Sequence, residues 1–426
     1  MSTEITNLSV NGVSRRSFLR TLGAASAAAA ALPAAGAFAQ QKANPAPAMS
    51  GNRAGFGSDM GEMRVLSPDT VIISSNENPL GPAQSSLDAI MKTSSLGGRY
   101  HQEISFQTVT TFNDIFGLKR GYSALFPGSG GPLDLALMSN IGPDKPLVMA
   151  GPSYEQGTRA AAVMKAPLFA VKLTPTYAHD VKAMLAAHPS PGAYYIVNPN
   201  TPTGTMTSRE DILWLLKNKP KGSIVIVDEA YFHFSDADSM LDQVAADQDL
   251  IVTRTFSKIY GMAGLRAGFA AARPDLLQRF TTVAPPARSL GSISITSAAG
   301  ARAGLLDKDL VPTRRKINAD NRSETIEFLT KKGYEVVPGS QANFFMVNVH
   351  RPGRDFQQAM LKENVAIGRT WAAMPTYVRV TVGTAPEMAK FQSAFVKCME
   401  MTPSTAPTSA ELYLPEHHIP TELYRG

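Results

Sequence analysis

The sequence of 426 residues has few of the features that mark several protein classes. Its only cysteine, Cys398, excludes an intrachain disulfide and a zinc site built from several cysteines. The seven histidines show no metal-ligand spacing, so we predict no metal site. The 41 basic residues only modestly outnumber the 35 acidic residues, and they form no cluster with interleaved aromatic residues. Nucleic-acid binding is therefore not supported.

The composition is that of an ordinary folded protein. Hydrophobic residues make up 44% of the chain and charged residues 18%, which excludes a mainly disordered protein. The length suits one large domain with a smaller one beside it, and the sequence contains no internal repeat. After the first forty residues, no segment has the length and apolarity of a membrane span.

The first 39 residues have the pattern of an export signal. Arg15 and Arg16 precede a weakly apolar, Ala-rich stretch, Thr21–Phe38, and a small-residue cleavage site ends at Ala39. This pattern resembles a twin-arginine signal peptide. An anchoring helix is the alternative, but Pro33 and the many alanines and glycines make the stretch a poor span. We expect the twin-arginine translocase to export the folded protein to the periplasm, without stable membrane insertion.

The remaining chain divides by pattern into an arm, a large domain, a smaller domain and a tail. Residues 40–70 read as a linker and arm, 71–99 as the N-terminal part of the small domain, and 401–426 as a polar tail. Between 100 and 310, short β-branched runs alternate with helical stretches, which predicts an α/β domain with a mainly parallel sheet. After a long helix, residues 311–400 predict a smaller α+β domain. The predicted strands are Pro146–Met149, Ala193–Val197, Ser223–Val227, Leu250–Thr253, Tyr334–Pro338, Phe344–Val349 and Tyr377–Val382.

The segment Thr255–Gly268 carries the strongest chemical signal. Lys258 lies between small hydroxyl residues just after a predicted buried strand, and Arg266 follows eight positions later. A lysine that forms a Schiff base must be held in a dry, shaped site, and the hydroxyls of Thr255 and Ser257 with Arg266 would neutralise a phosphate. A surface lysine in a loop is the usual alternative. The surrounding pattern favours a catalytic lysine that holds an aldehyde cofactor.

This segment resembles the lysine motif of the fold-type I, class I/II aminotransferases, close to their histidinol-phosphate aminotransferase branch. The resemblance covers roughly residues 70 to 400. It implies a seven-stranded, mainly parallel sheet between helices, bound pyridoxal 5′-phosphate, and a homodimer with a shared active site. The implied activity moves an amino group between an amino acid, or a similar amine, and a 2-oxo acid. A decarboxylase, lyase or amino-acid oxidase on the same fold is the alternative, and a binding protein without turnover is a third.

Two further motifs follow the order of that family. Asp228 ends a predicted strand, and the resemblance implies that it pairs with the cofactor's ring nitrogen and keeps the ring an electron sink. Tyr231 resembles the tyrosine that bonds the ring oxygen O3′. Gly130 and Gly131 open a predicted helix, so their free amides can cradle a phosphate. A helix cap for Asp228 and an ordinary turn at the glycines are the alternatives.

The resemblance implies roles for five more side chains. Tyr154 matches an aromatic residue that stacks on the cofactor ring, and Tyr100 one that reaches the phosphate of the neighbouring subunit. Arg379, on a predicted strand, matches the arginine that holds the substrate's α-carboxylate in two bonds. Asn78 lies in the family's substrate-side loop. Arg369 is shifted one position from the pattern of the histidinol-phosphate branch, so its role toward a distal group stays open.

One position departs from the family. Thr201 stands where the family usually has an asparagine that donates its amide to O3′. Either the Thr201 hydroxyl substitutes, or Asn200 swings in, or Tyr231 alone holds this oxygen. Losing a donor there is expected to raise the pKa of the link between lysine and cofactor. The sequence does not identify the amino donor.

Overall fold

The computed structural model describes residues 67, 69–283 and 293–401. The predicted export signal (1–39), most of the predicted arm (40–70) and nearly all of the predicted tail (401–426) lie outside these residues. Within the described ranges, no helix combines the length and the apolarity needed to cross a membrane.

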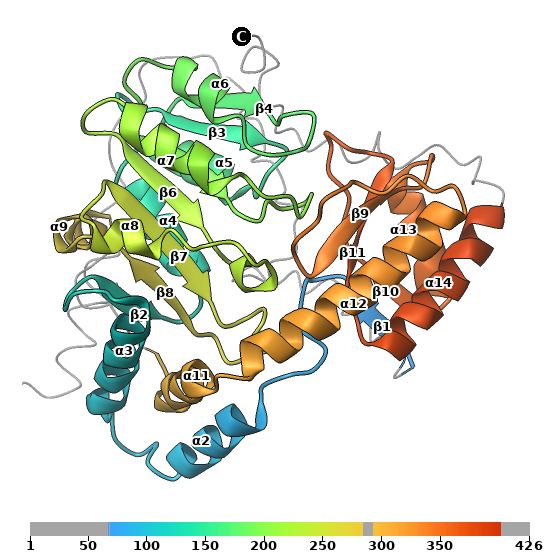
Figure 1. Cartoon of the computed structure of the whole chain (residues 1–426), viewed down its shortest axis with the longest axis horizontal. Coiled ribbons are helices and arrows are strands. Elements are labelled where there is room, and N and C mark those ends of the chain that lie inside the picture. The colour runs from blue at the N-terminus through green and yellow to red at the C-terminus, as the bar shows by residue number, and fades with distance from the viewer. Residues whose placement is uncertain (1–66, 68, 284–292, 402–426) are drawn as a thin grey trace, which may run out of the picture. The chain divides into compact units, whose positions relative to one another are not determined.

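A seven-stranded sheet forms the centre of the larger domain (Figure 1). Its strand order is β2-β8-β7-β6-β5-β3-β4; the strands from β7 to β4 run parallel, and β8 is antiparallel to both of its neighbours. This confirms the predicted mainly parallel sheet. The strands are β2 (Ser123–Phe126), β3 (Leu147–Gly151), β4 (Leu168–Lys172), β5 (Ala193–Val197), β6 (Ile224–Asp228), β7 (Leu250–Thr255) and β8 (Gly268–Ala271).

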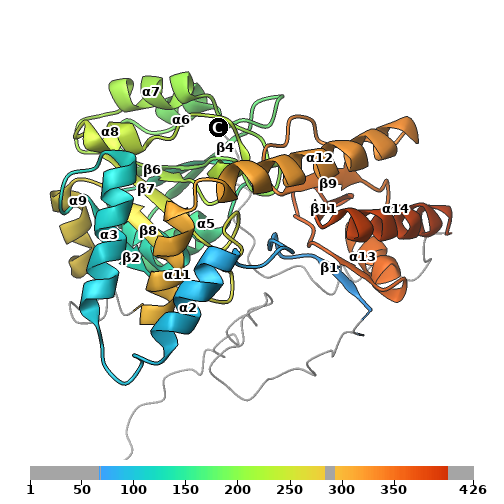
Figure 2. The ribbon, with the colours of Figure 1, turned by 60° about the horizontal axis from the view of Figure 1, so that its bottom comes forward.

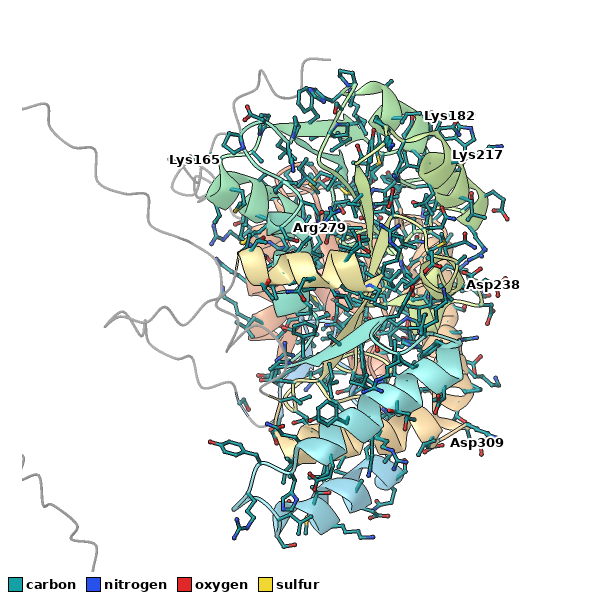
Figure 3. The ribbon with its side chains drawn as sticks, turned by 90° about the vertical axis from the view of Figure 1, so that its left-hand side faces the viewer. Lys165, Lys182, Lys217, Asp238, Arg279 and Asp309 are labelled. Atoms are coloured by element: carbon teal, nitrogen blue, oxygen red, sulfur yellow. The ribbon has the colours of Figure 1, made fainter. Side chains whose placement is uncertain are left out.

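Helices cover both faces of this sheet, so its central strands are continuous apolar runs. In β5, Tyr194 packs into one core and Tyr195 into the other, because successive side chains point to opposite faces. Figure 2 shows α6, α7 and α8 on one side of the sheet. In Figure 3, the exposed Lys182 and Lys217 lie on that side and Lys165 on the other. The helices are α3 (Gln102–Phe116), α4 (Gly130–Met138), α5 (Gln156–Met164), α6 (Val181–Ala186), α7 (Arg209–Asn218), α8 (Leu241–Ala245), α9 (Pro274–Gln278) and α11 (Ile295–Leu306).

The smaller domain has its own core, built on two short sheets. β9 (Phe344–Asn348) pairs antiparallel with β11 (Tyr377–Thr381), and β1 (Val71–Ile73) pairs parallel with β10 (Val365–Ile367). Three helices pack with these strands: α12 (Leu310–Lys331), α13 (Gly353–Lys362) and α14 (Ala385–Glu400). The predicted α+β domain is thus confirmed.

One predicted strand of this domain is wrong. In Tyr334–Pro338, only Val336 forms an isolated bridge, to Val347. Pro338 has no amide to donate, and Gly339 turns the chain away with φ +75°, so the pairing stops after one bridge. The other six predicted strands agree with the structure to within two residues at each end.

The predicted small-domain segment 71–99 divides between the two domains. Only β1 joins the smaller core, whereas α2 (Gln84–Ser94) packs against α11 of the larger domain. There Ser86 Oγ donates to the carbonyl of Gly300 over 2.9 Å, and a Cβ on Gly300 would lie 3.0 Å from Ile90. The chain therefore crosses from one domain to the other between Ile73 and Gln84, as Figure 2 shows.

Candidate active site

A cleft of about 690 Å³ opens at the C-terminal ends of the parallel strands. Val197, Asp228 and Thr255, at the ends of β5, β6 and β7, line it from the larger domain, and Arg379 of β11 lines it from the smaller one. Ligands of open α/β sheets bind at this edge, and the volume suits a cofactor-sized molecule. The fold therefore brings most of the predicted site residues into one place.

The predicted lysine and aspartate occupy neighbouring strand ends. Lys258 Nζ donates to the carbonyl of Ser75 over 3.3 Å and lies 5.3 Å from the centre of the Tyr231 ring. Asp228 Oδ1 accepts from Thr253 Oγ1 and from the amide of Ala230, each over 3.1 Å. Burial raises the pKa of Asp228 to about 6, although these two bonds and the charge of Lys258 act against the shift. A cationic partner inside the cleft would stabilise the ionised carboxylate.

A set of donors lies around the start of α4. Gly130 lines the cleft, and the first amides of a helix have no acceptor within it. Ser257 Oγ accepts from Thr255 Oγ1 over 2.9 Å and from Arg266 Nη1 over 3.1 Å, which leaves its own proton to donate. A Cβ on Gly128 would lie 2.3 Å from Arg266 Nη2, so only glycine lets this guanidinium approach. The donor set and the positive end of α4 fit a phosphate.

Arg379 faces the cleft from the opposite side. Its Nη2 donates to the carbonyl of Ser74 over 2.9 Å, and its guanidinium lies 5.1 Å from Trp371 and 5.5 Å from Phe344. Burial lowers the pKa of Arg379 to about 10, and its Nε has no partner among the described residues. A buried guanidinium with an unfilled donor in a water-poor, aromatic setting suits a planar carboxylate.

A second arginine, Arg369, also lines the cleft. Arg369 forms an ion pair with Glu155, and its guanidinium stacks 4.4 Å from the centre of the Trp371 ring. Both guanidiniums thus lie over the ring of Trp371. Both partners of the ion pair are partly exposed, with side-chain accessibilities of 52% for Arg369 and 35% for Glu155.

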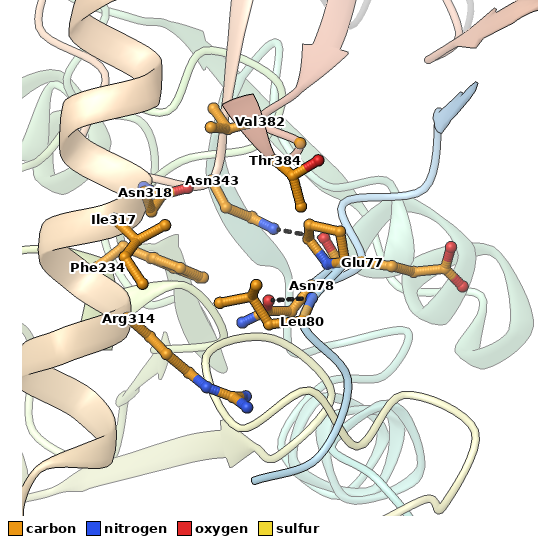
Figure 4. Close-up of a pocket in the computed structure, with 12 residues that line it drawn as sticks. Glu77, Asn78, Leu80, Phe234, Arg314, Ile317, Asn318, Asn343, Val382 and Thr384 are labelled. Atoms are coloured by element: carbon orange, nitrogen blue, oxygen red, sulfur yellow. Dashed lines mark hydrogen bonds between the residues drawn. The ribbon is translucent and has the colours of Figure 1, made fainter. Parts of the chain in front are cut away.

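Tyr154, Thr201 and Tyr231 also line the cleft, whereas four other predicted residues, Gly131, Tyr100, Asn78 and Asn200, do not. Gly131 is the second residue of α4, directly after Gly130. Tyr100 is 89% exposed on the surface. Asn78 donates to the carbonyl of Ile259 over 3.0 Å and lines a separate pocket of about 20 Å³ (Figure 4). Asn200 is fully buried and does not line the cleft.

The bonds of Asn200 account for its orientation. Its Oδ1 accepts from Ser153 Oγ over 2.7 Å, and its Nδ2 donates to Thr203 Oγ1 over 2.9 Å and to the carbonyl of Pro152 over 3.1 Å. These bonds disfavour the reading in which Asn200 swings in to replace the missing amide. The functional roles of all these side chains stay predictions.

Several cleft residues escaped the sequence analysis. Ser74 and Ser75 act through backbone carbonyls, which leave no signature in residue type. Asn76 donates its Nδ2 to Tyr231 Oη over 3.0 Å. Gln156 donates to the carbonyl of Gly130 over 2.6 Å and so braces the start of α4. Asn76, which lines the cleft, lies two residues before the predicted Asn78.

Comparison with known proteins decides the family. The family described as "Aminotransferase class I and II" matches residues 68–395. The chain belongs to this family. Membership confirms the predicted enzyme, a pyridoxal-phosphate-dependent aminotransferase of fold type I.

The relatives of this aminotransferase point to one branch. It is 32% identical to histidinol-phosphate aminotransferase 1 of Nitrosococcus oceani over 326 residues, covering 75% of this chain and 86% of the relative. It is 31% identical to histidinol-phosphate aminotransferase 1 of Cupriavidus pinatubonensis, covering 78% and 88%. Among solved structures, a putative histidinol-phosphate aminotransferase from Erwinia carotovora atroseptica superposes with a TM-score of 0.73 at 26% identity, covering 77% and 95%. Histidinol-phosphate aminotransferase from Sinorhizobium meliloti, in complex with pyridoxal-5′-phosphate, superposes with a TM-score of 0.69 at 22% identity. The match covers 78% of this chain and 90% of that one.

The residues of this aminotransferase fit the cofactor. Lys258 would supply the amine, buried Asp228 the acid for the ring nitrogen, and Tyr231 a phenol for the ring oxygen. The phosphate would be held by the amides at the start of α4 with Thr255, Ser257 and Arg266. This phosphate site requires glycine at position 128, because a Cβ there would collide with the guanidinium of Arg266.

Proposed function

We propose that this aminotransferase uses amino acids and 2-oxo acids that carry an α-carboxylate. The supporting observation is Arg379: a buried guanidinium that lines the cleft, lies against two aromatic rings and keeps Nε without a partner in the described chain. A carboxylate would bind this guanidinium in a setting where charge-assisted bonds are strong. Arg379 would then fix the substrate's α-carbon beside Lys258.

The side chains of the cleft divide the chemical work. When bound, pyridoxal phosphate supplies an aldehyde and an electron sink for the reacting carbon. Lys258 Nζ would be the proton carrier of the cleft, placed to move a proton at the substrate's α-carbon. The Asp228 carboxylate holds the proton of the ring nitrogen, and the phenol of Tyr231 holds the ring oxygen. The donors around Ser257 and Arg266 orient the phosphate.

The donor is proposed to be an α-amino acid rather than histidinol phosphate. Histidinol phosphate, named in the relatives, carries a phosphate but no carboxylate. Histidinol phosphate would therefore leave the buried guanidinium of Arg379 without a carboxylate partner. A donor with an α-carboxylate would supply that partner.

A donor panel tests this proposal. The holoenzyme is incubated with 2-oxoglutarate and each of a set of amino acids or histidinol phosphate, and glutamate, the new 2-oxo acid, ammonia and carbon dioxide are measured. We expect glutamate and a 2-oxo acid in equal amounts from at least one amino acid. The highest kcat/KM for histidinol phosphate would refute the donor class, whereas ammonia or carbon dioxide without glutamate would favour an oxidase, lyase or decarboxylase.

Arg369 is proposed to serve the distal carboxylate of a dicarboxylic acceptor. A half-exposed ion pair is worth less than about 1 kcal/mol, so an incoming carboxylate can replace Glu155 at little cost. Trp371 keeps the guanidinium in place when Glu155 leaves. One cleft could then accept a neutral donor with the pair closed and a dicarboxylic acceptor with the pair open.

The active enzyme is proposed to be a homodimer in which Tyr100 enters the neighbouring site. Tyr100 is 89% exposed, and Met91 (75%) and Phe106 (67%) are large apolar residues exposed on the same stretch of chain. Such side chains are typical of a covered surface. Mixed dimers of Lys258→Ala and Tyr100→Ala subunits should regain activity, because one site of each mixed dimer keeps both residues. Mixed dimers without any gain would contradict a shared site.

The site of action is proposed to be the periplasm. The support is the twin-arginine pattern at Arg15 and Arg16, since that pathway carries folded proteins and a bound cofactor can travel inside. Cell fractionation should find the protein in the periplasm, and Arg15→Lys/Arg16→Lys should leave it in the cytoplasm. Equal distribution of the two forms would overturn export by this route.

A further inference from the structure

The chain between Ile73 and Gln84, which crosses from one domain to the other, is called the crossing segment below. Three consecutive residues of it each bond a different residue of the active site. The carbonyl of Ser74 accepts from Arg379, the carbonyl of Ser75 accepts from Lys258, and Asn76 Nδ2 donates to Tyr231 Oη. Asn76 is only 1% exposed, and it is held in the left-handed conformation at φ +53°. Asparagine tolerates this conformation better than most residues. Burial and backbone conformation therefore both favour asparagine at position 76.

Thr381 fixes which end of the Asn76 amide faces the tyrosine. The backbone amide of Asn76 donates to Thr381 Oγ1 over 2.9 Å, and Thr381 Oγ1 donates to Asn76 Oδ1 over 3.1 Å. A hydroxyl has one proton, and here that proton is used on Oδ1. In this arrangement the NH₂ end of the amide points to Tyr231, at 3.0 Å. Reversing the amide would leave the proton of the buried Thr381 hydroxyl without that acceptor.

The hydrogen bond from Asn76 also determines whether Tyr231 donates or accepts a hydrogen bond in the cleft. Its phenol oxygen accepts the Asn76 proton, so its own proton is left to point into the cleft. We propose that Asn76 is a positioning residue, oriented by Thr381, that makes Tyr231 a hydrogen-bond donor toward the cofactor oxygen. Asn76 would thereby offset the amide that Thr201 lacks, from the opposite side of the cleft.

Neighbouring groups support this role. Asn343 Nδ2 donates to the carbonyls of Asn76 and Glu77 over 3.2 and 3.1 Å, which holds the segment in place. Burial alone would raise the pKa of Tyr231, but the charges of Lys258 and Arg379 and the Asn76 donor lower it overall. Thr381 lies two residues after Arg379 on β11, so the strand that would grip the substrate also orients Asn76.

The first test is the ionisation of Tyr231 in the full chain without cofactor. The near-ultraviolet absorbance of ionised phenol is titrated with pH, and the curve of a matched Tyr231→Phe background is subtracted. We expect Asn76→Ala to raise the Tyr231 pKa by about one unit, since one hydrogen bond to the phenolate is lost. Asn76→Asp should raise it further, because a carboxylate accepts the phenol proton and repels the phenolate.

Matched variants separate orientation from mere folding. Thr381→Val should raise the pKa in the same direction as Asn76→Ala, and Thr381→Ser should keep the wild-type value. Asn78→Ala removes a bond of the same segment, to the carbonyl of Ile259, and should leave the Tyr231 pKa unchanged. The proposal is overturned if folded Asn76→Ala and Thr381→Val both keep the wild-type pKa, or if Asn78→Ala moves it equally.

The second test uses the holoenzyme and its visible absorption. The midpoint of the absorbance change with pH is measured for Asn76→Ala in the wild-type and Thr201→Asn backgrounds. Because Thr201→Asn restores an amide donor, we expect Asn76→Ala to shift the midpoint less in that background. Equal shifts in the two backgrounds would mean that Asn76 does not offset Thr201, and would overturn that part of the proposal.

Discussion

The two walls of the cleft are built in different ways. Within the sheet side, bonds between functional residues join residues close along the chain: Ser257 bonds Arg266 nine residues away, and Asp228 bonds Thr253 25 residues away. Lys258 and Tyr231 also bond the segment between the domains, 183 and 155 residues away. On the other side, the bonds from Asn76 to Thr381 and from Arg379 to Ser74 each join residues 305 positions apart. The sheet side is thus set by local motifs, whereas the crossing segment is set only when both domains have folded.

Removing Lys258 should have the largest effect of all. We expect Lys258→Ala to lower kcat at least about 10⁴-fold, or roughly 5.5 kcal/mol, because the site loses both its amine and its proton carrier. The other sheet-side residues remain, so the protein should still retain pyridoxal phosphate during gel filtration. Single-turnover kinetics with an amino donor measure the loss. A variant within tenfold of wild type would show that the sheet side does not carry the chemistry.

A buried ion pair beneath Asp228 should be the most sensitive structural element of the sheet side. Arg254 Nε donates to Glu229 Oε2 over 2.8 Å, and its guanidinium lies 4.7 Å from Phe116 and 5.0 Å from Phe232. Arg254→Met leaves the Glu229 carboxylate buried without its cation, so we expect a loss of about 4 kcal/mol in unfolding free energy. Urea denaturation measures it.

The matching control for that pair is the double variant Glu229→Met/Arg254→Met. It removes both charges, so it should be more stable than Arg254→Met alone. If Arg254→Met lowered the unfolding free energy less than the double variant does, the unpaired Glu229 carboxylate would not be the cause of the loss.

The same contrast between the two walls decides what the sequence could predict. The sheet and the residues Lys258 and Asp228 were predictable, because apolar runs and reactive side chains are visible in residue type. Ser75 was not, since a backbone carbonyl has no such signature. The orientation of Asn200 was left open because it depends on Ser153, which lies 47 residues away in sequence. Long-range contacts of ordinary polar groups are what the sequence hides.

Asp228 should show a pH-dependent effect of intermediate size. Its pKa, about 6 in the folded chain against about 3.9 unfolded, means that the folded form binds the proton more tightly. Wild type without cofactor should therefore lose stability relative to Asp228→Asn as the pH rises from about 4 to about 6, by up to about 3 kcal/mol. Thermal unfolding across this range measures the difference.

Binding of pyridoxal phosphate should make wild type more stable than Asp228→Asn, the reverse of the order expected without cofactor. The ring nitrogen gives the Asp228 carboxylate a cationic partner, which Asp228→Asn cannot use. Wild type should then be the more stable form at pH 8. If Asp228→Asn never exceeds wild type in the cofactor-free state, burial does not destabilise this carboxylate.

The smallest effect on stability is expected at Arg369, which belongs to neither wall's buried network. Arg369→Met should change the unfolding free energy by less than about 1 kcal/mol, since its ion pair with Glu155 is partly exposed. It should nevertheless raise KM for a dicarboxylic 2-oxo acid about tenfold, because one charge-assisted bond is lost, and leave KM for a monocarboxylic one nearly unchanged. Glu155→Gln frees the guanidinium and should lower the dicarboxylic KM. Parallel changes for both acceptors would place Arg369 outside the substrate subsite.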